Sequence, residues 1–342
     1  MQILISILVT IIVFGILIFV HESGHFFVAK ACKVKVNEFS LGMGPAIFKK
    51  RVKDTLYSLR ALPIGGYVQM DGEDGGGTDE NSFNNKKYWQ RFLILFAGAA
   101  LNIILGFVLI CIINYFTAKL PTTVIALFDD GASSQQSGLQ VDDKIIDIDG
   151  YGINSFYDMS YAMSTKGTEP LSVTVLRDGK EVTVENVSFK IAHDDTIGDY
   201  FDLDFKVYPQ KRTFWGNLKF SFDWTVSITK SIYSFLGSLF VGQGNLNHVS
   251  GPVGTTVAIG QSVSYGFKSV LLMVALISLN LGIVNLLPFP ALDGGRIFLL
   301  AIESVRRKPI SPKVETAINA TGLILLLVLM AVITLKDVIN LF

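Results

Sequence analysis

The chain has 342 residues, of which 50% are hydrophobic and 17% are charged, and its mean hydropathy is +0.46. This balance is typical of a membrane protein that carries a soluble portion. The 29 basic and 29 acidic residues cancel to a net charge of zero, which argues against a nucleic-acid-binding protein. Cys32 and Cys111 have no metal-type spacing and imply no disulfide framework.

A histidine pair follows the first uncharged stretch. Residues 1–20 contain no charge, and His21-Glu22-Ser23-Gly24-His25 comes directly after them. On a helix this H-E-x-x-H pattern places both imidazoles on one face, where they can ligate one zinc ion, and Glu22 is placed to take a proton from a metal-bound water. A single histidine is more often structural, but two of the chain's four histidines fall in this motif. Because charge inside lipid is costly and usually marks function, the motif predicts a protease active site within the membrane.

Four apolar segments are long enough to cross a bilayer, which takes about twenty residues. They are residues 3–27, 92–116, 269–290 and 317–335. The first segment lacks the positive n-region and the small-residue cleavage site of a signal peptide, so we expect it to be retained as a span.

Loop charge orients these spans. Residues 28–91 carry eleven Lys and Arg and residues 296–313 carry five, whereas the long loop 119–267 carries eleven over 149 residues. The positive-inside rule places the two short basic loops in the cytoplasm, which predicts that both termini and the long loop face outside. The first and third spans then run in the same direction.

This orientation makes Asp293 the candidate third ligand of the metal, since a catalytic zinc usually has three protein ligands. His21 and Asp293 lie about 30 to 35 Å along two parallel spans, at the 1.5 Å rise of a helix, and so reach similar depth. Segment 285–295 contains two prolines and two glycines, so we expect it to be unwound. The alternative is that Asp293-Gly294 simply ends a helix at the interface.

Asn285 also lies at membrane depth, eight residues before Asp293. Its amide could donate a hydrogen bond to a substrate carbonyl or to the developing oxyanion. A hydrogen bond between two helices is the alternative role for this side chain.

The long loop is predicted to contain a β-rich segment followed by an amphipathic helix. Residues 122–207 have strand patterning with a hairpin signal at Arg177-Asp178-Gly179-Lys180. A plain β-rich spacer is the alternative to a binding domain. In residues 213–241 aromatic and aliphatic side chains recur at helical spacing, and tryptophan near the start suits the membrane interface. This helix could gate substrate entry, but such a stripe is usually packing, so we expect it to cover the bundle.

Five segments stand out together: HESGH (21–25), SLGMGP (40–45), SLRALPIGGYV (58–68), SGPVG (250–254) and NLLPFPALDGG (285–295). They resemble the site-2 protease family of intramembrane metalloproteases, specifically the bacterial RseP-type regulators of sigma-factor signalling. The resemblance implies a Zn²⁺ cofactor held by His21, His25 and Asp293. It also implies that Glu22 is the catalytic base and that Asn285 contacts substrate.

The resemblance also implies how substrate is handled. Hairpins between the first two spans would dip toward the active site and pair with an unwound substrate, whose helix otherwise hides its scissile carbonyls. Residues 132–150 resemble the early part of a bacterial PDZ domain, with Asp142 where that family usually has glycine. At Ala97-Gly98-Ala99 the chain lacks the proline that is usual in the protease family.

We therefore expect a polytopic α-helical membrane protein with four transmembrane helices, a cytoplasmic-side β-hairpin region and one extracytoplasmic PDZ-like β-rich domain. The expected parts are residues 1–118 with the first two spans, the H-E-x-x-H motif and the hairpins; residues 119–210 with the PDZ-like domain; residues 211–267 with the amphipathic interfacial helix and a linker; and residues 268–342 with the last two spans and the L-D-G-G motif.

The predicted function is a zinc-dependent endopeptidase of the bacterial plasma (inner) membrane, acting in regulated intramembrane proteolysis. The resemblance implies substrates that are single-span membrane proteins, such as anti-sigma factors or remnant signal peptides, cut within or near their transmembrane segment. We expect a monomer in the lipid bilayer with no nucleic-acid partner. One alternative is a non-catalytic PDZ-containing adaptor with a structural metal. Another is a transporter with a broken helix, which would require solute-coupled flux and the internal repeat of that class.

Overall fold

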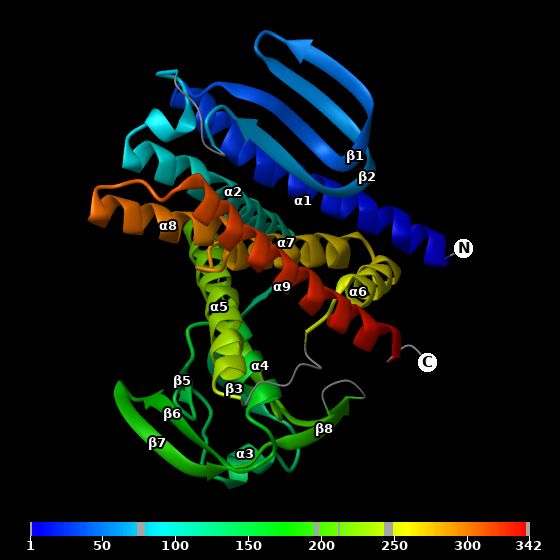
Figure 1. The fold of residues 1–342 in the computed structure, drawn as a ribbon. Helices are drawn as coiled ribbons and strands as arrows, with labels where there is room; N and C mark the ends of the chain where they lie inside the picture. The colour runs from blue at the N-terminus through cyan, green and yellow to red at the C-terminus, as the bar shows by residue number, and fades with distance from the viewer. Residues whose placement is uncertain (1, 74–78, 195–197, 211–212, 243–248, 340–342) are drawn as a thin grey trace. The chain divides into compact units, whose positions relative to one another are not determined.

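The computed structural model describes residues 2–73, 79–194, 198–210, 213–242 and 249–339. The chain forms two compact units, one made of residues 1–106 with 250–342 and the other of residues 107–249. The first unit holds the histidine motif and the Asp293 segment, and the second holds the β-rich region (Figure 1).

Among the described residues, four helices are long and apolar enough to cross a membrane. They are α1 (Gln2–Ala31), α2 (Tyr88–Tyr115), α7 (Phe267–Asn285) and α9 (Pro312–Ile339). Large apolar side chains such as Leu8, Ile12, Ile324 and Val328 are exposed on them, which is expected of helices solvated by lipid. Each predicted span falls on one of these helices. The prediction of a four-helix membrane protein with β-sheet regions is confirmed at this level.

Two further helices lie in segments that the sequence analysis described as a loop and a linker. Residues 296–313 fall largely in α8 (Asp293–Arg306), and the expected linker contains α6 (Pro252–Ser264). Only two of the 14 residues of α8 are basic, Arg296 and Arg306, and the basic residues that mark the segment as a loop lie mainly at and after the end of the helix, at positions 306, 307, 308 and 313. In α6 the Gly, Ser and Thr content weakens the apolar period, although proline at its first position is a common helix start.

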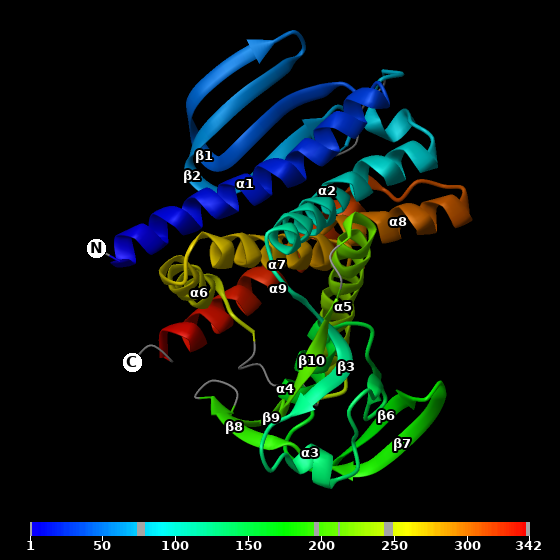
Figure 2. The ribbon, with the colours of Figure 1, turned by 180° about the vertical axis from the view of Figure 1, so that it is seen from behind.

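The N-terminus of α6 is held by a carboxylate from α9. Asp337 Oδ2 accepts hydrogen bonds from the backbone N–H groups of Gly251 and Gly254, each at 2.8 Å. Helix N-termini leave such donors unpaired, and a carboxylate there also complements the helix dipole. A Cβ atom at Gly251 or Gly254 would lie 2.9 or 3.0 Å from the same oxygen, so both positions need glycine for this approach. Figures 1 and 2 show α6 beside the end of α9 that carries Asp337.

The segment between α1 and α2 forms a sheet from two long strands, β1 (Val36–Val52) and β2 (Thr55–Met70), and a short 3₁₀ helix (Phe83–Asn85) follows it. The strands pair antiparallel, and residues 38–41 of β1 have register partners in both 56–59 and 66–69 of β2. The first half of β1 therefore lies between two segments of β2, and residues 66–70 form an edge of the sheet. Figures 1 and 2 both show this sheet beside α1.

The second unit contains a six-stranded sheet of spatial order β10-β3-β4-β6-β7, in which β5 pairs with β4, and a separate β8–β9 hairpin. Its elements are β3 (Leu120–Phe128), α3 (Ser133–Gln136), β4 (Lys144–Ile148), β5 (Tyr151–Gly152), α4 (Phe156–Thr165), β6 (Leu171–Arg177), β7 (Lys180–Val187), β8 (Lys190–Asp194), β9 (Gly198–Asp202), β10 (Phe205–Gln210) and α5 (Phe214–Phe240). The predicted hairpin is present, with Arg177 paired to Lys180 across the β6–β7 turn.

Asp142 takes the backbone conformation for which glycine is usual. Its φ is 72°, in the left-handed region that glycine and, less often, aspartate adopt. The turn before β4 therefore has a backbone conformation that glycine would also adopt.

A buried carboxylate joins α4 to α5 in the second unit. Asp158 on α4 is fully buried and accepts a hydrogen bond from Ser227 Oγ on α5 at 2.6 Å. Lys230 Nζ lies 3.9 Å from the same carboxylate and over the ring of Tyr151. Burial lowers the pKa of Lys230, whereas burial and the Asp158 charge together raise the pKa of Tyr151. Helix α5 is thus fixed to the β-rich domain by polar contacts.

We expect Asp337→Ala to destabilise the protein by about 1–3 kcal/mol, because two N–H groups at the start of α6 lose their acceptor. Thermal unfolding of the purified protein in detergent measures this. Asp337→Asn is the matched control: it keeps an acceptor oxygen and should lose less. Equal unfolding temperatures for wild type and Asp337→Ala would contradict the capping role.

Candidate metal centre and active site

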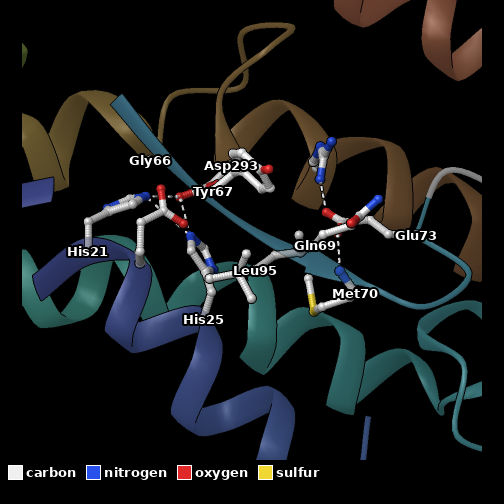
Figure 3. A pocket seen from close by; sticks show the side chains of 12 residues that line it. His21, His25, Gly66, Tyr67, Gln69, Met70, Glu73, Leu95 and Asp293 are labelled. Atoms are coloured by element: carbon white, nitrogen blue, oxygen red, sulfur yellow. Dashed lines mark hydrogen bonds and ion pairs between the residues drawn. The ribbon is translucent and has the colours of Figure 1, made fainter. Parts of the chain in front are cut away.

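Three side chains converge on one point in the first unit. His21 and His25 project from α1, one helical turn apart, and Asp293 is the first residue of α8 (Figure 3). The two Nε2 atoms lie 3.2 Å apart, and they lie 3.2 Å (His21) and 3.4 Å (His25) from Asp293 Oδ2. Among the described residues, the ligand atoms of His21, His25 and Asp293 are close enough together to bind one metal ion.

The triangle of donor atoms fits zinc. Zinc binds imidazole nitrogen and carboxylate oxygen at about 2.0–2.2 Å in tetrahedral geometry, which separates neighbouring ligand atoms by roughly 3.3–3.5 Å. The observed separations of 3.2 to 3.4 Å match this spacing. Among the described residues, the buried Asp293 Oδ2 atom has no hydrogen-bond partner, although both ring nitrogens are near it. A buried oxygen that faces two imidazole nitrogens but is bonded to neither is suited to a cation.

Close packing of α1 against α2 positions His25. A Cβ atom at Gly24 would lie 2.3 Å from Ala97 O, and one at Gly98 would lie 2.2 Å from His25 Nε2. Only glycine at both positions lets the two helices approach this closely. The approach brings His25 Nδ1 to 2.8 Å from Ile94 O, so Nδ1–H donates to this carbonyl and Nε2 is left with its lone pair for a metal.

A tight break between α7 and α8 positions Asp293. Ala291 has φ of 73°, and a Cβ atom at Gly294 or Gly295 would lie 2.2 Å from a carbonyl oxygen of the preceding loop. Ala291 N–H donates to Asn319 Oδ1 on α9 at 3.3 Å. The chain therefore unwinds at residues 286–292, around the two prolines, as predicted. Gly294 and Gly295 were also expected to be unwound, but they belong to α8, which begins at Asp293, where a carboxylate complements the helix dipole.

A cavity of about 400 Å³ opens beside the three ligand atoms. It is lined by His21, Glu22, His25, Gly66, Tyr67, Val68, Gln69, Met70, Glu73, Leu95, Asp293 and Arg296. The edge segment of β2 forms one wall (Figure 3). This wall lies close to Glu22, because a Cβ atom at Gly66 would be 3.1 Å from Glu22 Cγ. A peptide in this cavity would therefore meet the metal ligands, a carboxylate and an exposed strand edge together.

Of the predicted site residues, the structure brings together His21, Glu22, His25 and Asp293. Asn285 is the last residue of α7 and does not line this cavity. Sequence reasoning missed the ion pair of Arg296 with Glu73, which also line the cavity. Arg296 follows Asp293 by one helical turn, which is a usable signal, but Glu73 could be found only from the fold.

Sequence reasoning also missed the side chain of Asn102 on α2, which lies beside His21. Its Nδ2 atom is 3.3 Å from His21 Nδ1, and the residue is fully buried. The signal available in the sequence was an amide inside an otherwise uncharged, apolar span.

The whole chain is similar to known zinc metalloproteases. Residues 9–329 match the model of Peptidase family M50. The Fusobacterium nucleatum subsp. nucleatum protein named "Putative zinc metalloprotease FN1322" is 36% identical over 98% of this chain and 99% of its own length. "Zinc metalloprotease RasP" of Shouchella clausii is 29% identical over 98% and 99%. The resemblance to the site-2 protease family is confirmed. The chain belongs to Peptidase family M50, the site-2 protease family, and is a zinc-dependent metalloendopeptidase.

Proposed function

We propose that this protein cleaves single-span membrane proteins within or near their transmembrane segment, as a bacterial intramembrane protease. The observation that supports this most directly is the position of the ligand triangle. Two of its three members, His21 and His25, lie on α1, a helix apolar enough to cross a bilayer, and the triangle lies beside a cavity lined by the edge of β2. Anti-sigma factors and remnant signal peptides are the proposed substrate classes, on the family resemblance.

In this proposal His21, His25 and Asp293 hold the zinc ion. Bound there, zinc supplies Lewis acidity that makes water a stronger acid and polarises the scissile carbonyl. The two imidazoles enter as neutral ligands, and the Asp293 carboxylate offsets part of the metal charge, which matters in a membrane environment of low dielectric constant.

Glu22 is the proposed general base. It adjoins His21 in the sequence and lines the cavity next to the ligand atoms. Its carboxylate takes a proton from the attacking water as the water adds to the peptide carbonyl, and it then returns a proton to the leaving amine as the C–N bond breaks. One residue thus serves as base and then as acid, and no net proton is consumed within the site.

The edge of β2 is the proposed docking strand for substrate. A transmembrane helix hides its carbonyl groups in internal hydrogen bonds, so cleavage requires an extended segment with replacement partners. Within the described part of the chain, residues 66–69 pair in the sheet with β1 on one side only, so this edge at the cavity wall could accept an added strand. We also assign Asn285, at the break after α7, to donate a hydrogen bond to the substrate backbone.

The β-rich region 119–210 is proposed to be a PDZ-like domain on the extracytoplasmic side, with both termini on that side as the distribution of basic residues predicts. Residues 1–118 and 268–342 would form the catalytic membrane part, and residues 211–267 would connect it to the PDZ-like domain. We propose that the protein acts as a monomer. A PDZ-containing adaptor with a structural metal is the second candidate, favoured if peptides bind without zinc-dependent turnover.

Asp293→Ala is expected to lower the zinc content of the purified protein from about one ion per chain to near zero, because two imidazoles alone form an incomplete site. Metal analysis after dialysis measures this. The matched control is Asp158→Ala, which removes a buried carboxylate from the second unit and should leave zinc in place. Full zinc occupancy in Asp293→Ala would refute the ligand assignment.

Glu22→Gln is expected to keep its zinc but to lose cleavage by at least about 10²-fold, because the amide is nearly isosteric and cannot accept the proton. The assay uses protein in detergent, a shortened single-span substrate and product mapping by mass spectrometry. Wild-type cleavage inside the substrate's membrane segment is the expected control. Normal turnover by the variant would remove Glu22 from the mechanism.

Gly66→Ala is expected to reduce cleavage with no change in zinc content, because the added Cβ would lie 2.9 Å from Ile18 Cγ2 and from Ser40 O. The β2 edge must then shift away from Glu22. Leu62→Ala, on an exposed side chain of the same strand, is the control. Equal kcat/KM values for Gly66→Ala and wild type would argue against docking of substrate on this edge.

A further inference from the structure

The buried carboxamide of Asn102 has no role in the mechanism above, yet it faces a metal ligand. Its Nδ2 atom lies 3.3 Å from His21 Nδ1, and its Oδ1 atom is buried with no hydrogen-bond partner among the described residues. The side chain is completely inaccessible in the middle of α2. A buried amide with an unpaired oxygen lowers the stability of the protein unless another group satisfies that oxygen. Such a side chain therefore calls for an explanation.

The same helix already holds the other imidazole by its ring nitrogen. His25 Nδ1 donates to Ile94 O on α2, while the Nε2 atoms of both histidines point toward Asp293. Thus each histidine presents Nδ1 to α2 and Nε2 to the proposed metal position. A histidine that ligates through Nε2 carries its proton on Nδ1 and needs an acceptor there. For His25 the acceptor is a backbone carbonyl, and for His21 the only neighbour seen at Nδ1 among the described residues is Asn102.

A carboxamide has an acceptor and a donor of almost the same shape, so the neighbouring group decides which of the two it meets. Because zinc ligation leaves a proton on His21 Nδ1, the oxygen of Asn102 must face it. We propose that Asn102 is a positioning residue: its Oδ1 accepts from His21 Nδ1–H and so fixes the tautomer and orientation in which Nε2 binds zinc. This proposal rests on the proposed ligand role of His21.

The position of Asn102 is itself tightly fixed by α7. Ser278 Oγ donates to the backbone carbonyl of Asn102 at 2.7 Å. A Cβ atom at Gly282 would lie 2.8 Å from Ala99 O, and one at Gly106 would lie 2.5 Å from Leu279 Cγ. Helices α2 and α7 therefore touch closely on both sides of Asn102, which leaves its side chain little freedom to turn away from His21.

The experiment measures zinc affinity of the full-length protein in detergent by competition with a chromophoric chelator. Asn102→Leu, similar in size but without an acceptor, should weaken zinc binding by about 10- to 100-fold, as is typical for loss of a partner to a metal-bound histidine. Asn102→Asp, which keeps an acceptor oxygen, should bind zinc at least as tightly as wild type. Asn114→Leu is the matched control, because Asn114 is buried in the same helix but donates to Ser221 Oγ.

The ring-¹⁵N spectrum of the zinc-loaded protein gives a second readout that simple packing would not change. The chain has four histidines, so the His21 signals can be identified by their loss in His21→Ala. We expect the proton on Nδ1 in wild type and Asn102→Asp, and a displaced Nδ1 signal in Asn102→Leu.

Wild-type zinc affinity in Asn102→Leu would overturn the positioning role, and so would a loss in folded Asn102→Asp as large as that expected for Leu. If Asn102→Leu does not fold, Asn102→Asp and the wild-type spectrum still decide the question. Failure of the underlying ligand assignment looks different: zinc would then bind His21→Ala as tightly as wild type.

Discussion

The contact between α1 and α2 sets the geometry on which the active site depends. Gly24 and Gly98 face each other where any larger residue would collide with Ala97 O or with the His25 ring. This contact brings the Ile94 carbonyl and the Asn102 carboxamide to the two imidazoles. Helix α2, which carries no proposed metal ligand, thus orients α1, which carries two. Lipid tails are as apolar as the side chains, so the hydrophobic effect does not drive membrane helices together. Such helices associate through close packing, which small residues at the contact allow.

The second constraint is that α7 ends before Asp293, the proposed third metal ligand. The chain leaves the helical conformation at residues 286–292, and α8 begins at Asp293. A Cβ atom at Gly294 or Gly295 would lie 2.2 Å from a carbonyl oxygen of this break, and Ala291 N–H donates to Asn319 Oδ1 on α9. Unwound backbone is tolerated at membrane depth where protein covers it. The break therefore depends on α9, whose Gly322 leaves room for Pro290.

Much of this site could be predicted from short sequence motifs and from the number and direction of the membrane crossings. Each of these can be obtained from the sequence without knowing the fold. The H-E-x-x-H spacing indicates two ligands directly, and the parallel direction of two spans indicates that Asp293 reaches the same depth. The Arg296–Glu73 ion pair could not be found in this way, since its members are 223 residues apart. Helix α6 escaped prediction for a related reason: Asp337, a distant residue, stabilises its N-terminus. When a residue distant in the sequence stabilises a helix, the hydrophobic periodicity within that helix predicts it poorly.

Charge balance supports the proposed position of this site within the membrane. Glu22 and Asp293 together bring two negative charges when ionised, and a divalent cation bound by the proposed ligands would cancel them. The nearby Arg296 and Glu73 cancel each other as an ion pair. Uncompensated charge is costly in a low-dielectric setting, and removing one member of a buried pair costs more than the pair contributes. With the metal bound, the proposed ligands, the proposed base and the ion pair would therefore have no net charge together. Loss of the metal should disturb the charge balance of all these residues, whereas loss of the Asn102 side chain should change only the orientation of His21.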